Sequence, residues 1–201
     1  MLYDLLILGG GPGGYTAAER AGQAGLKVAL FEKDALGGVC LNEGCIPTKT
    51  MLNSAKLYNH ANNSEVFAVK SLEVSFNQAQ VVKRKNKVVK TLIGGVKAKM
   101  KNNGVEVIKA EASIRGKEDD LFRVDALNEK YLGKNLLIAT GSVPFVPPIP
   151  GLKEGLESGF VVTNKGILDL EEIPEKMTVI GGGVIGLEMA CYYQTVGSKV
   201  T

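Results

Sequence analysis

The chain has 201 residues, 45% of them hydrophobic, and a net charge of +3. This length fits one large domain or two small ones, and the apolar fraction excludes a disordered protein. The mild charge calls for no polyanionic partner, and no apolar run approaches the ~18 residues that cross a bilayer. We therefore expect neither a nucleic-acid partner nor a membrane partner.

The first 31 residues predict a strand, a helix and a second strand. Residues 3–8 are almost continuously apolar, as expected for a strand that is buried on both faces. A glycine turn and a helix of small residues follow, Gly25 lies just past the helix end, and residues 28–31 form the next strand. The chain enters the first strand without the basic leader of a signal peptide, so we expect a cytoplasmic location.

The glycine turn has the pattern Gly9-x-Gly11-x-x-Gly14. In a dinucleotide site the first glycine permits the tight turn, the second admits the pyrophosphate, and the third lets helix and strand pack closely. Glu32 lies about twenty residues further on, where an acid that binds ribose is expected. The pattern predicts a dinucleotide site, with an ordinary glycine turn as the alternative.

The segment "GGVCLNEGCIPTK", residues 37–49, contains Cys40 and Cys45. This pair could be a structural crosslink, part of a metal site, a buried pair of inert thiols or a working dithiol. In a reducing compartment a close cysteine pair favours catalysis or metal binding. Five residues of regular helix advance ~7.5 Å, which exceeds the Cα separation of a disulfide. A bridge therefore requires a tighter segment, which Gly44 would permit.

The metal alternative needs further ligands. Cys191 is remote in the sequence, and His60 is the only histidine. A structural zinc site usually has four such ligands. We predict no metal site.

The middle of the chain predicts two helices followed by strands. Residues 48–60 and 78–101 have helical patterns, although Gly94 and Gly95 weaken the second. The second helix is rich in lysine and lacks acids from 83 to 101. We interpret this as a solvated face, because the alternative, a footprint for nucleic acid or an acidic partner, lacks interleaved aromatic residues and a binding motif. The predicted strands of a meander and a return strand are 105–114, 121–127 and 130–140.

Residues 141–151, "GSVPFVPPIPG", contain four prolines, which disfavour both helix and central strand. We predict a first domain at 1–143, a proline-rich linker at 144–151 and the start of a second domain at 152–201. The second domain repeats the opening pattern, with a glycine turn at Gly181-x-Gly183-x-x-Gly186. Two such turns imply two dinucleotide sites and electron transfer between two cofactors. Because the repeat is incomplete at Thr201, we expect the chain to be part of a longer protein.

These motifs together resemble the FAD-dependent pyridine nucleotide–disulfide oxidoreductases. The resemblance covers all 201 residues and rests on the first glycine turn, "GGVCLNEGCIPTK", "ATGS" at 139–142 and "VIGGGVIGLE" at 179–188. Val39 replaces the family's usual threonine. The implied fold is α/β: a Rossmann-like FAD-binding domain with a β-meander, followed by the start of a Rossmann-like NAD-binding domain.

The resemblance also assigns roles to single residues. Cys40 would be the thiol that exchanges with substrate, and Cys45 the thiol that lies against the flavin. Lys49 would lie near the flavin and pair with Glu188, and Glu32 would bind the adenosine ribose. The other residues implied for FAD are Gly9, Gly11, Pro12, Gly13, Gly14, Lys33, Gly38, Val39, Ala112, Thr140, Gly141 and Ser142, with Cys40 and Lys49 also in contact. Those implied for NAD are Gly181, Gly183, Val184, Ile185, Gly186 and Glu188.

Within the family, "CLNEGCIPTK" most resembles the dihydrolipoyl dehydrogenases. The implied activity is NAD-dependent oxidation of a dihydrolipoyl group on a 2-oxoacid dehydrogenase or glycine cleavage complex, by a homodimer. The alternatives are a reductase of glutathione disulfide or mercuric ion, or an inactive FAD-binding fragment. The family's general-base histidine has no counterpart here: we interpret His60 as a surface residue and Cys191 as core filling.

Overall fold

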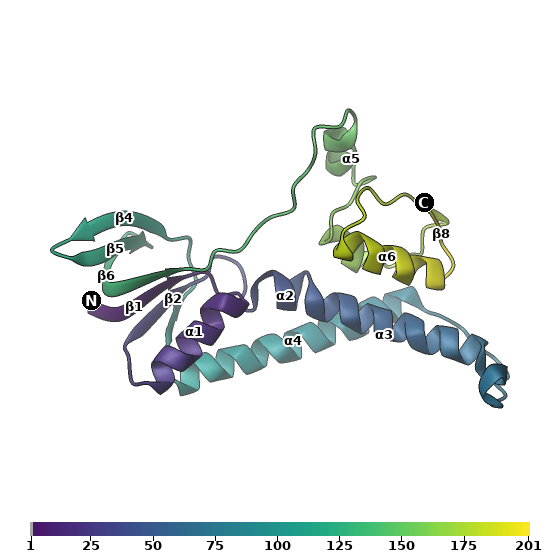
Figure 1. The fold of residues 1–201 in the computed structure, drawn as a ribbon, viewed down its shortest axis with the longest axis horizontal. Helices are drawn as coiled ribbons and strands as arrows, with labels where there is room; N and C mark the ends of the chain where they lie inside the picture. Colours follow the sequence, from purple (N-terminus) through teal and green to yellow (C-terminus); the bar gives the residue numbers. More distant parts are fainter. Residues whose placement is uncertain (1) are drawn as a thin grey trace. The chain divides into compact units, whose positions relative to one another are not determined.

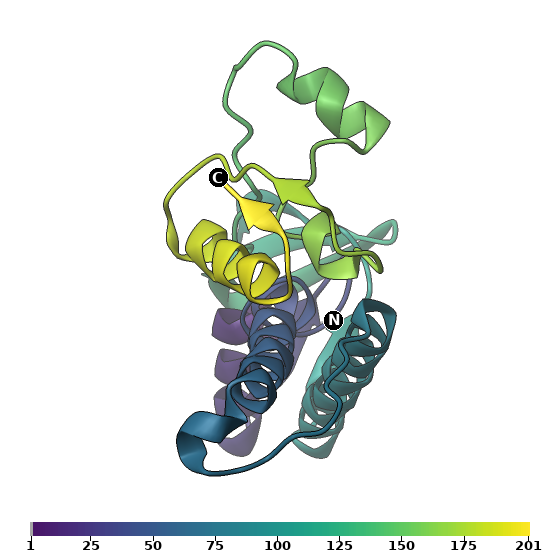
Figure 2. The same cartoon turned by 90° about the vertical axis from the view of Figure 1, so that its right-hand side faces the viewer.

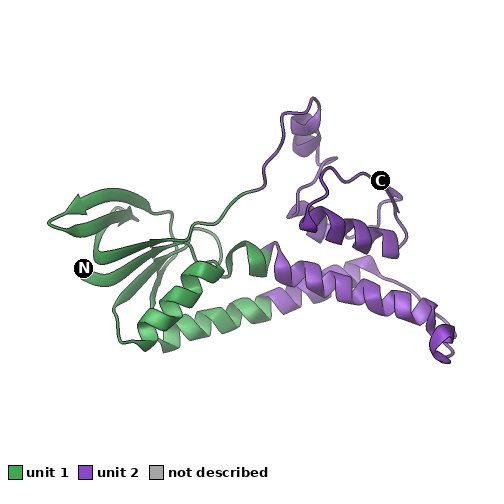
Figure 3. Cartoon of the chain, viewed as in Figure 1, with its two compact units in different colours: residues 1–42, 90–143 green, residues 43–89, 144–201 purple. Residues whose placement is uncertain are grey.

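The computed structural model describes residues 2–201. Contacts within the chain divide it into two compact units, neither of which is one continuous segment (Figure 3). Unit 1 contains the residues up to Asn42 together with Lys90–Val143. Unit 2 contains Glu43–Val89 and Pro144–Thr201. The predicted domain boundaries at 143 and 152 stay a prediction.

Unit 1 is built on a six-stranded sheet with the order β3-β2-β1-β6-β5-β4. The first four strands in that order are parallel, and β5 and β4 add an antiparallel hairpin. The bounds are β1 Leu2–Leu8, β2 Val28–Phe31, β3 Glu106–Ile108, β4 Ser113–Glu118, β5 Leu121–Ala126 and β6 Glu129–Ile138. This arrangement confirms the predicted α/β class and the meander.

One of the two inner strands of the parallel part is β1, whose apolar run is paired on both sides. Leu8 pairs with Phe31 of β2 and with Ile138 of β6. Leu6 and Ile7 point to opposite faces of the sheet and are both fully buried, as expected for a strand that is covered on both faces. The aromatic rings of Phe31 and Tyr131 meet edge to face at 5.0 Å in the same core. These contacts fix the end of β1, from which the first glycine turn begins.

The helix α1, Pro12–Gln23, follows that turn with a proline at its first position. Its buried residues are small, namely Gly14, Ala18 and Ala21, so the helix lies close to the sheet. The last part of α4 runs beside α1, and Lys99 pairs with Glu19 at 3.1 Å (Figure 1). The helix packing therefore holds the glycine turn in place.

One predicted strand is two separate strands. The sequence pattern predicts one continuous strand at 105–114, but β3 ends at Ile108 and β4 begins at Ser113. The physical reason is topological, because β3 and β4 form opposite edges of the sheet. Residues 109–112 carry the chain from one edge to the other.

Unit 2 combines the helix after the cysteine segment with the C-terminal part of the chain. Its elements are α3 Cys45–Asn62, η1 Ser64–Phe67, the start of α4 Gln78–Asn102, α5 Leu152–Ser158, η2 Gly166–Asp169, β7 Lys176–Met177, α6 Val184–Thr195 and β8 Lys199–Val200. The strands β7 and β8 pair in parallel, and α6 connects them (Figure 2). The glycines inside α4 do not interrupt it, since buried Val81 and Met100 hold the helix on either side.

The core of unit 2 includes hydrogen bonds as well as apolar contacts. Met51 of α3 packs with Leu168 and with Tyr192 and Tyr193 of α6. Tyr193 donates to the carbonyl of Ile167 at 2.8 Å, and Tyr192 donates to the Gln78 side chain at 2.5 Å. Burial raises the pKa of Tyr193 to about 12. Helices α3, α4 and α6 are thereby joined to the segment around η2.

Buried Lys85 of α4 also contributes to this core, because its ammonium group pairs with Asp169 at 2.5 Å.

Within residues 2–201, no helix combines the length and apolar character needed to span a membrane.

Candidate functional site

The first glycine turn lies where the connections of the parallel sheet diverge. From β1 the chain continues through α1 to β2 on one side, while β6 flanks β1 on the other. Ligands of open α/β sheets bind at the carboxyl ends of strands at such a point. The N-terminus of α1 begins there, with backbone N–H groups suited to an anion.

Two of the three glycines are required by the local backbone. Gly9 has φ +101°, and a Cβ there would lie 2.1 Å from the carbonyl oxygen of Ala139. At Gly14 a Cβ would lie 1.8 Å from the carbonyl oxygen of Gly9. Gly11 differs, since the nearest atom to its Cβ would be the Cα of Gly38 at 3.6 Å. Gly11 is therefore not required by packing within the chain.

A second loop closes over this turn. The N–H of Gly37 donates to the carbonyl oxygen of Gly10 at 2.8 Å. A Cβ on Gly38 would lie 2.6 Å from the Cα of Gly11, so this close approach requires glycine. The two backbones form a cradle in front of α1, with exposed Pro12 and Gly13 at its edge.

Glu32 follows the last residue of β2 and turns toward the cradle. One of its carboxylate oxygens accepts the N–H of Gly10 at 2.8 Å, and the other accepts the N–H of Asp34 at 2.8 Å. The structure thus places the Glu32 carboxylate at the first glycine turn, and its predicted binding of ribose stays a prediction. Lys33 points to a different neighbour and pairs with Glu111 at 3.9 Å.

Residues 139–142 leave the carboxyl end of β6 beside the same turn. The N–H of Ala139 donates to the carbonyl oxygen of Leu8 at 2.8 Å. Gly141 adopts φ +72°, and Thr140 and Ser142 flank it without regular structure. Ala112 packs against the core of unit 1, in the crossing that precedes β4.

Cys40 and Cys45 form a disulfide. Cys40 lies in α2, Gly38–Asn42, and Cys45 is the first residue of α3. The two helices are not continuous, because Gly44 has φ −140° and ψ −111°, neither of them helical. The expectation that the segment must depart from a regular helix at Gly44 is confirmed. Cys45 is exposed and Cys40 half-buried.

Lys49 lies four residues after Cys45, one turn along the same helix. Its ammonium group donates to the carboxylate of Glu188 in α6. The Lys49 side chain is 64% exposed and that of Glu188 is 25% exposed. The structure therefore brings together the two residues that the resemblance had paired across 139 positions.

The second glycine turn precedes α6 and has the same stereochemistry as the first. Gly181 has φ +114°, and a Cβ on Gly186 would lie 2.4 Å from the carbonyl oxygen of Gly181. Around Gly183 no atom lies within 4 Å of a Cβ position. Val184 and Ile185, the first residues of α6, are 71% and 50% exposed. The turn is open in front of the helix N-terminus.

Sequence reasoning missed the residues that hold the connection between the two cysteines. The side-chain amide of Asn164 donates to the backbone carbonyl oxygen of Glu43 at 3.0 Å. The ammonium group of Lys165 pairs with the Glu43 carboxylate at 2.6 Å. These residues lie just before η2, more than a hundred positions away, and no motif marks them.

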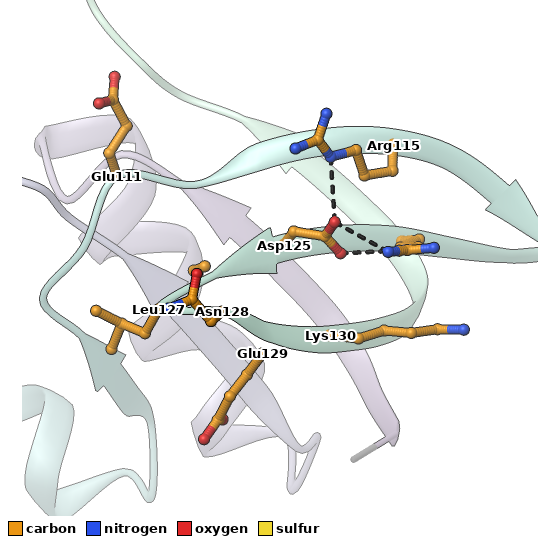
Figure 4. Close-up of a pocket in the computed structure, with 9 residues that line it drawn as sticks. Glu111, Arg115, Asp125, Leu127, Asn128, Glu129 and Lys130 are labelled. Atoms are coloured by element: carbon orange, nitrogen blue, oxygen red, sulfur yellow. Dashed lines mark hydrogen bonds and ion pairs between the residues drawn. The ribbon is translucent and has the colours of Figure 1, made fainter.

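Two other features lie outside this site. A hollow of about 430 Å³ at the β4–β5–β6 meander is lined by charged side chains (Figure 4). Asp125 in it accepts from Arg123 at 2.8 Å and from Arg115 at 3.1 Å, which holds the pKa of the Asp125 carboxyl below its ordinary value. The lining contains both acidic and basic side chains, and Asp125 pairs with two of the bases, so the hollow has no concentration of one charge.

His60 is exposed, as predicted. The prediction that Cys191 fills the core is wrong, because it is exposed on α6. The helix is apolar nearly all round, so its pattern did not indicate which face is buried, and Met189, Tyr192 and Tyr193 occupy that face. Within residues 2–201, no group of three or more His, Cys, Asp or Glu residues is arranged to hold a metal ion.

Comparison with known proteins gives the class. Residues 3–201 match the pyridine nucleotide-disulphide oxidoreductase family, so the chain belongs to that family. In structure it is similar to an HOCl-induced flavoprotein disulfide reductase, RclA, from Escherichia coli, solved as a Cu(II) complex. The TM-score is 0.80 at 30% identity, over 98% of this chain and 40% of the other.

Curated relatives give a more particular likeness. The chain is 48% identical to a dihydrolipoyl dehydrogenase of Acholeplasma laidlawii, over 99% of this chain and 58% of the relative. It is 42% identical to that of Mycoplasma pneumoniae and 44% identical to that of Chlorobaculum tepidum, covering 43% and 42% of those proteins. The chain thus spans about half the length of these relatives.

Proposed function

We propose that the protein containing this chain is an NAD-dependent dihydrolipoyl dehydrogenase that works through FAD and the Cys40–Cys45 disulfide. The observation that carries the proposal is the disulfide at the start of α3, one turn before the Lys49–Glu188 pair. A structural crosslink would not need an ion-paired lysine one helical turn after it. The relatives named dihydrolipoyl dehydrogenase favour this substrate class.

The residues of unit 1 fit FAD. The Gly9–Gly14 turn and the α1 N-terminus offer N–H groups to a pyrophosphate, and Gly11 leaves the space that a Cβ would fill. Glu32 would accept from a ribose hydroxyl at the edge of this cradle, with Lys33, Gly38, Val39, Ala112 and 140–142 around the cofactor. When bound, FAD supplies a two-electron acceptor for the dithiol and a donor to NAD.

The residues of unit 2 fit the second dinucleotide. The turn at Gly181, Gly183 and Gly186 leaves the N-terminus of α6 open to a pyrophosphate. Val184 and Ile185 are exposed at this end and would line the approach. Glu188 lies one turn further and holds Lys49.

The chain's own chemistry is thiol–disulfide exchange. One dihydrolipoyl thiolate attacks the Cys40 sulfur, which forms a mixed disulfide and releases Cys45 as a thiolate. The N-terminus of α3 and the Lys49 ammonium stabilise that negative charge. The second thiolate of the same dihydrolipoyl group then attacks the lipoyl sulfur that is bonded to Cys40. This closes the lipoyl disulfide and releases Cys40 as a thiolate. The substrate loses two electrons and two protons, and the cysteine pair holds the electrons.

The proposed partner is a lipoyl-bearing protein of a 2-oxoacid dehydrogenase or glycine cleavage complex. We also propose a homodimer in the cytoplasm. The resemblance of the chain to the dihydrolipoyl dehydrogenases supports these proposals.

The test is an assay of the full-length protein with dihydrolipoamide and NAD. Cys40→Ser and Cys45→Ser should each abolish turnover, because neither variant can form the disulfide. Cys191→Ser is the matched control, since this third cysteine is exposed and free of a disulfide, and it should keep full activity. Turnover that persists in Cys40→Ser would contradict the mechanism.

A second candidate is reduction of another disulfide by the same cysteine pair. The similarity to the E. coli flavoprotein disulfide reductase favours it. Faster turnover with glutathione disulfide and a reduced pyridine nucleotide than with dihydrolipoamide would support this candidate over the first.

A further inference from the structure

The backbone that joins the redox cysteines is held from outside by two consecutive residues. We propose that Asn164 and Lys165 are positioning residues that favour closure of the Cys40–Cys45 disulfide. The proposal rests on the redox role proposed above for this pair. Neither glycine turn takes part in it, and the family resemblance assigned no role to Glu43, Asn164 or Lys165.

Glu43 is the point of attachment. Only Glu43 and Gly44 lie between the end of α2 and the start of α3, so they are the non-helical part of the ring that the disulfide closes. The Asn42 side chain donates to the Gly38 carbonyl oxygen at 2.9 Å, within α2. Cys45 begins a helix of eighteen residues. The conformational freedom of the ring is therefore concentrated at the two joining residues.

Both the backbone and the side chain of Glu43 are fixed. Asn164 binds its carbonyl oxygen and Lys165 binds its carboxylate, and all three residues belong to unit 2. Asn164 is half-buried, and the Lys165 and Glu43 side chains are 67% and 31% exposed. The hydrogen bond to the backbone should contribute more than the exposed ion pair.

These contacts involve no sulfur atom, so they remain possible when the disulfide opens. Reduction adds two electrons and two protons, which a dithiol reductant supplies as it becomes a disulfide itself. The opened ring then gains backbone freedom, which opposes closure. A Glu43 held by Asn164 gains less of that freedom, so the anchor keeps the thiols close and shifts the equilibrium toward the disulfide.

The experiment measures that equilibrium in the full-length protein. The protein is equilibrated without oxygen in buffers of varied ratio of reduced to oxidised dithiothreitol. Free thiols are then alkylated, and the fraction of bridged Cys40–Cys45 peptide is determined by mass spectrometry. Loss of one hydrogen bond to the loop in Asn164→Ala should lower the equilibrium constant for closure about fivefold. Asn164→Leu, similar in shape but without a donor, should give the same shift.

The matched control is Asn63→Ala. Its side-chain amide donates to the Asn59 carbonyl oxygen at 2.9 Å, also in unit 2 but at the far end of α3. That variant loses the same kind of bond and should leave the equilibrium unchanged. Lys165→Gln provides a second variant at an exposed position, with an expected shift of about twofold that vanishes at high salt.

Equal closure constants for Asn164→Ala, Lys165→Gln and the parent would overturn the inference and leave the proposed function intact. Equal shifts in Asn164→Ala and Asn63→Ala would also overturn it, because the effect would then be general. Absence of any Cys40–Cys45 bridge in the parent would overturn both this inference and the proposed function. If Asn164→Ala does not fold, Lys165→Gln decides alone.

Discussion

Lys49 and Glu188 form an ion pair that joins the helix of Cys45 to the helix behind the second glycine turn. The Lys49 side chain is largely exposed, so the pair itself contributes little to stability. Its importance lies in where it holds the ammonium group.

We expect Glu188→Gln to change the free energy of unfolding by less than about 1 kcal/mol. Turnover of dihydrolipoamide should fall about tenfold to a hundredfold, because the Lys49 ammonium loses its fixed position. The control is Glu157→Gln, which removes an exposed pair with Lys153 in α5. Denaturant unfolding and steady-state kinetics on the same samples measure the two effects. Equal activity in both variants would contradict the assigned role.

Glu32 should matter for cofactor retention. Its carboxylate accepts two backbone N–H groups next to the glycine turn, and removing it leaves the N–H of Gly10 without that acceptor. Glu32→Ala should weaken FAD binding about tenfold or more, which corresponds to a hydrogen bond to a charged group. Glu118→Ala, which removes a carboxylate of the same unit that pairs with Arg123 in the meander, is the control. Flavin release measured by fluorescence gives the result, and unchanged retention in Glu32→Ala would refute the assignment.

Substitutions at two glycines of the first turn should separate an effect on stability from an effect on FAD binding. Gly14→Ala places a Cβ against the Gly9 carbonyl oxygen, so we expect it to cost about 3 kcal/mol of stability. Gly11→Ala meets nothing closer than 3.6 Å and should change stability by no more than about 1 kcal/mol. Its methyl group should nevertheless impair FAD binding, because it enters the space in front of α1. Thermal unfolding and bound-flavin absorbance distinguish the two variants, and normal flavin content in Gly11→Ala would argue against the cradle.

Tyr193 should make unit 2 sensitive to alkali. Burial raises its pKa from 10.0 to about 12, so the folded state retains a proton that the unfolded state loses above pH 10. The corresponding stability is complete below pH 10 and is lost as the pH rises toward about 12. Tyr193→Phe should cost about 1 to 2 kcal/mol at neutral pH, because the Ile167 carbonyl loses its donor.

The same variant should lose stability less steeply than the parent at alkaline pH, so the difference between them narrows between pH 10 and 12. Tyr58→Phe, at a half-buried position in unit 2, controls for removal of a hydroxyl group. Urea unfolding at several pH values tests this. Parallel curves for Tyr193→Phe and the parent would show that Tyr193 does not carry the effect.

Much of the fold could be predicted because the informative patterns are local. The apolar run before Gly9, the glycine turns and the break at Gly44 each depend on neighbouring residues, and the structure has β1, both turns and the α2–α3 break there. The single long strand at 105–114 failed because strand pattern does not reveal that the chain must cross between sheet edges. The Lys49–Glu188 pair came from family resemblance and not from pattern.

The contacts of Glu43 could not be predicted from the sequence. Asn164 and Lys165 are 121 and 122 positions from Glu43 and lie in no motif. A side-chain amide that binds a backbone carbonyl leaves no signal of its own, since almost any residue can supply the carbonyl. The lysine-rich pattern likewise predicts a solvated position for Lys85, which is in fact buried, because its partner Asp169 lies in a distant segment.

The division of the chain has a practical consequence for anyone who wishes to express its parts. Residues 43–89 share an apolar core with the C-terminal part, including Met51 and Val81 packed with Leu168 and Tyr192. A gene cut at the proline-rich segment would leave Met51 and Val81 uncovered in the first product and the two tyrosines of α6 uncovered in the second. Both products would expose apolar surface that is buried in the uncut chain, and such surface favours aggregation. A fragment that is meant to fold must therefore contain all the segments of one unit, and not simply the residues on one side of the proline-rich segment.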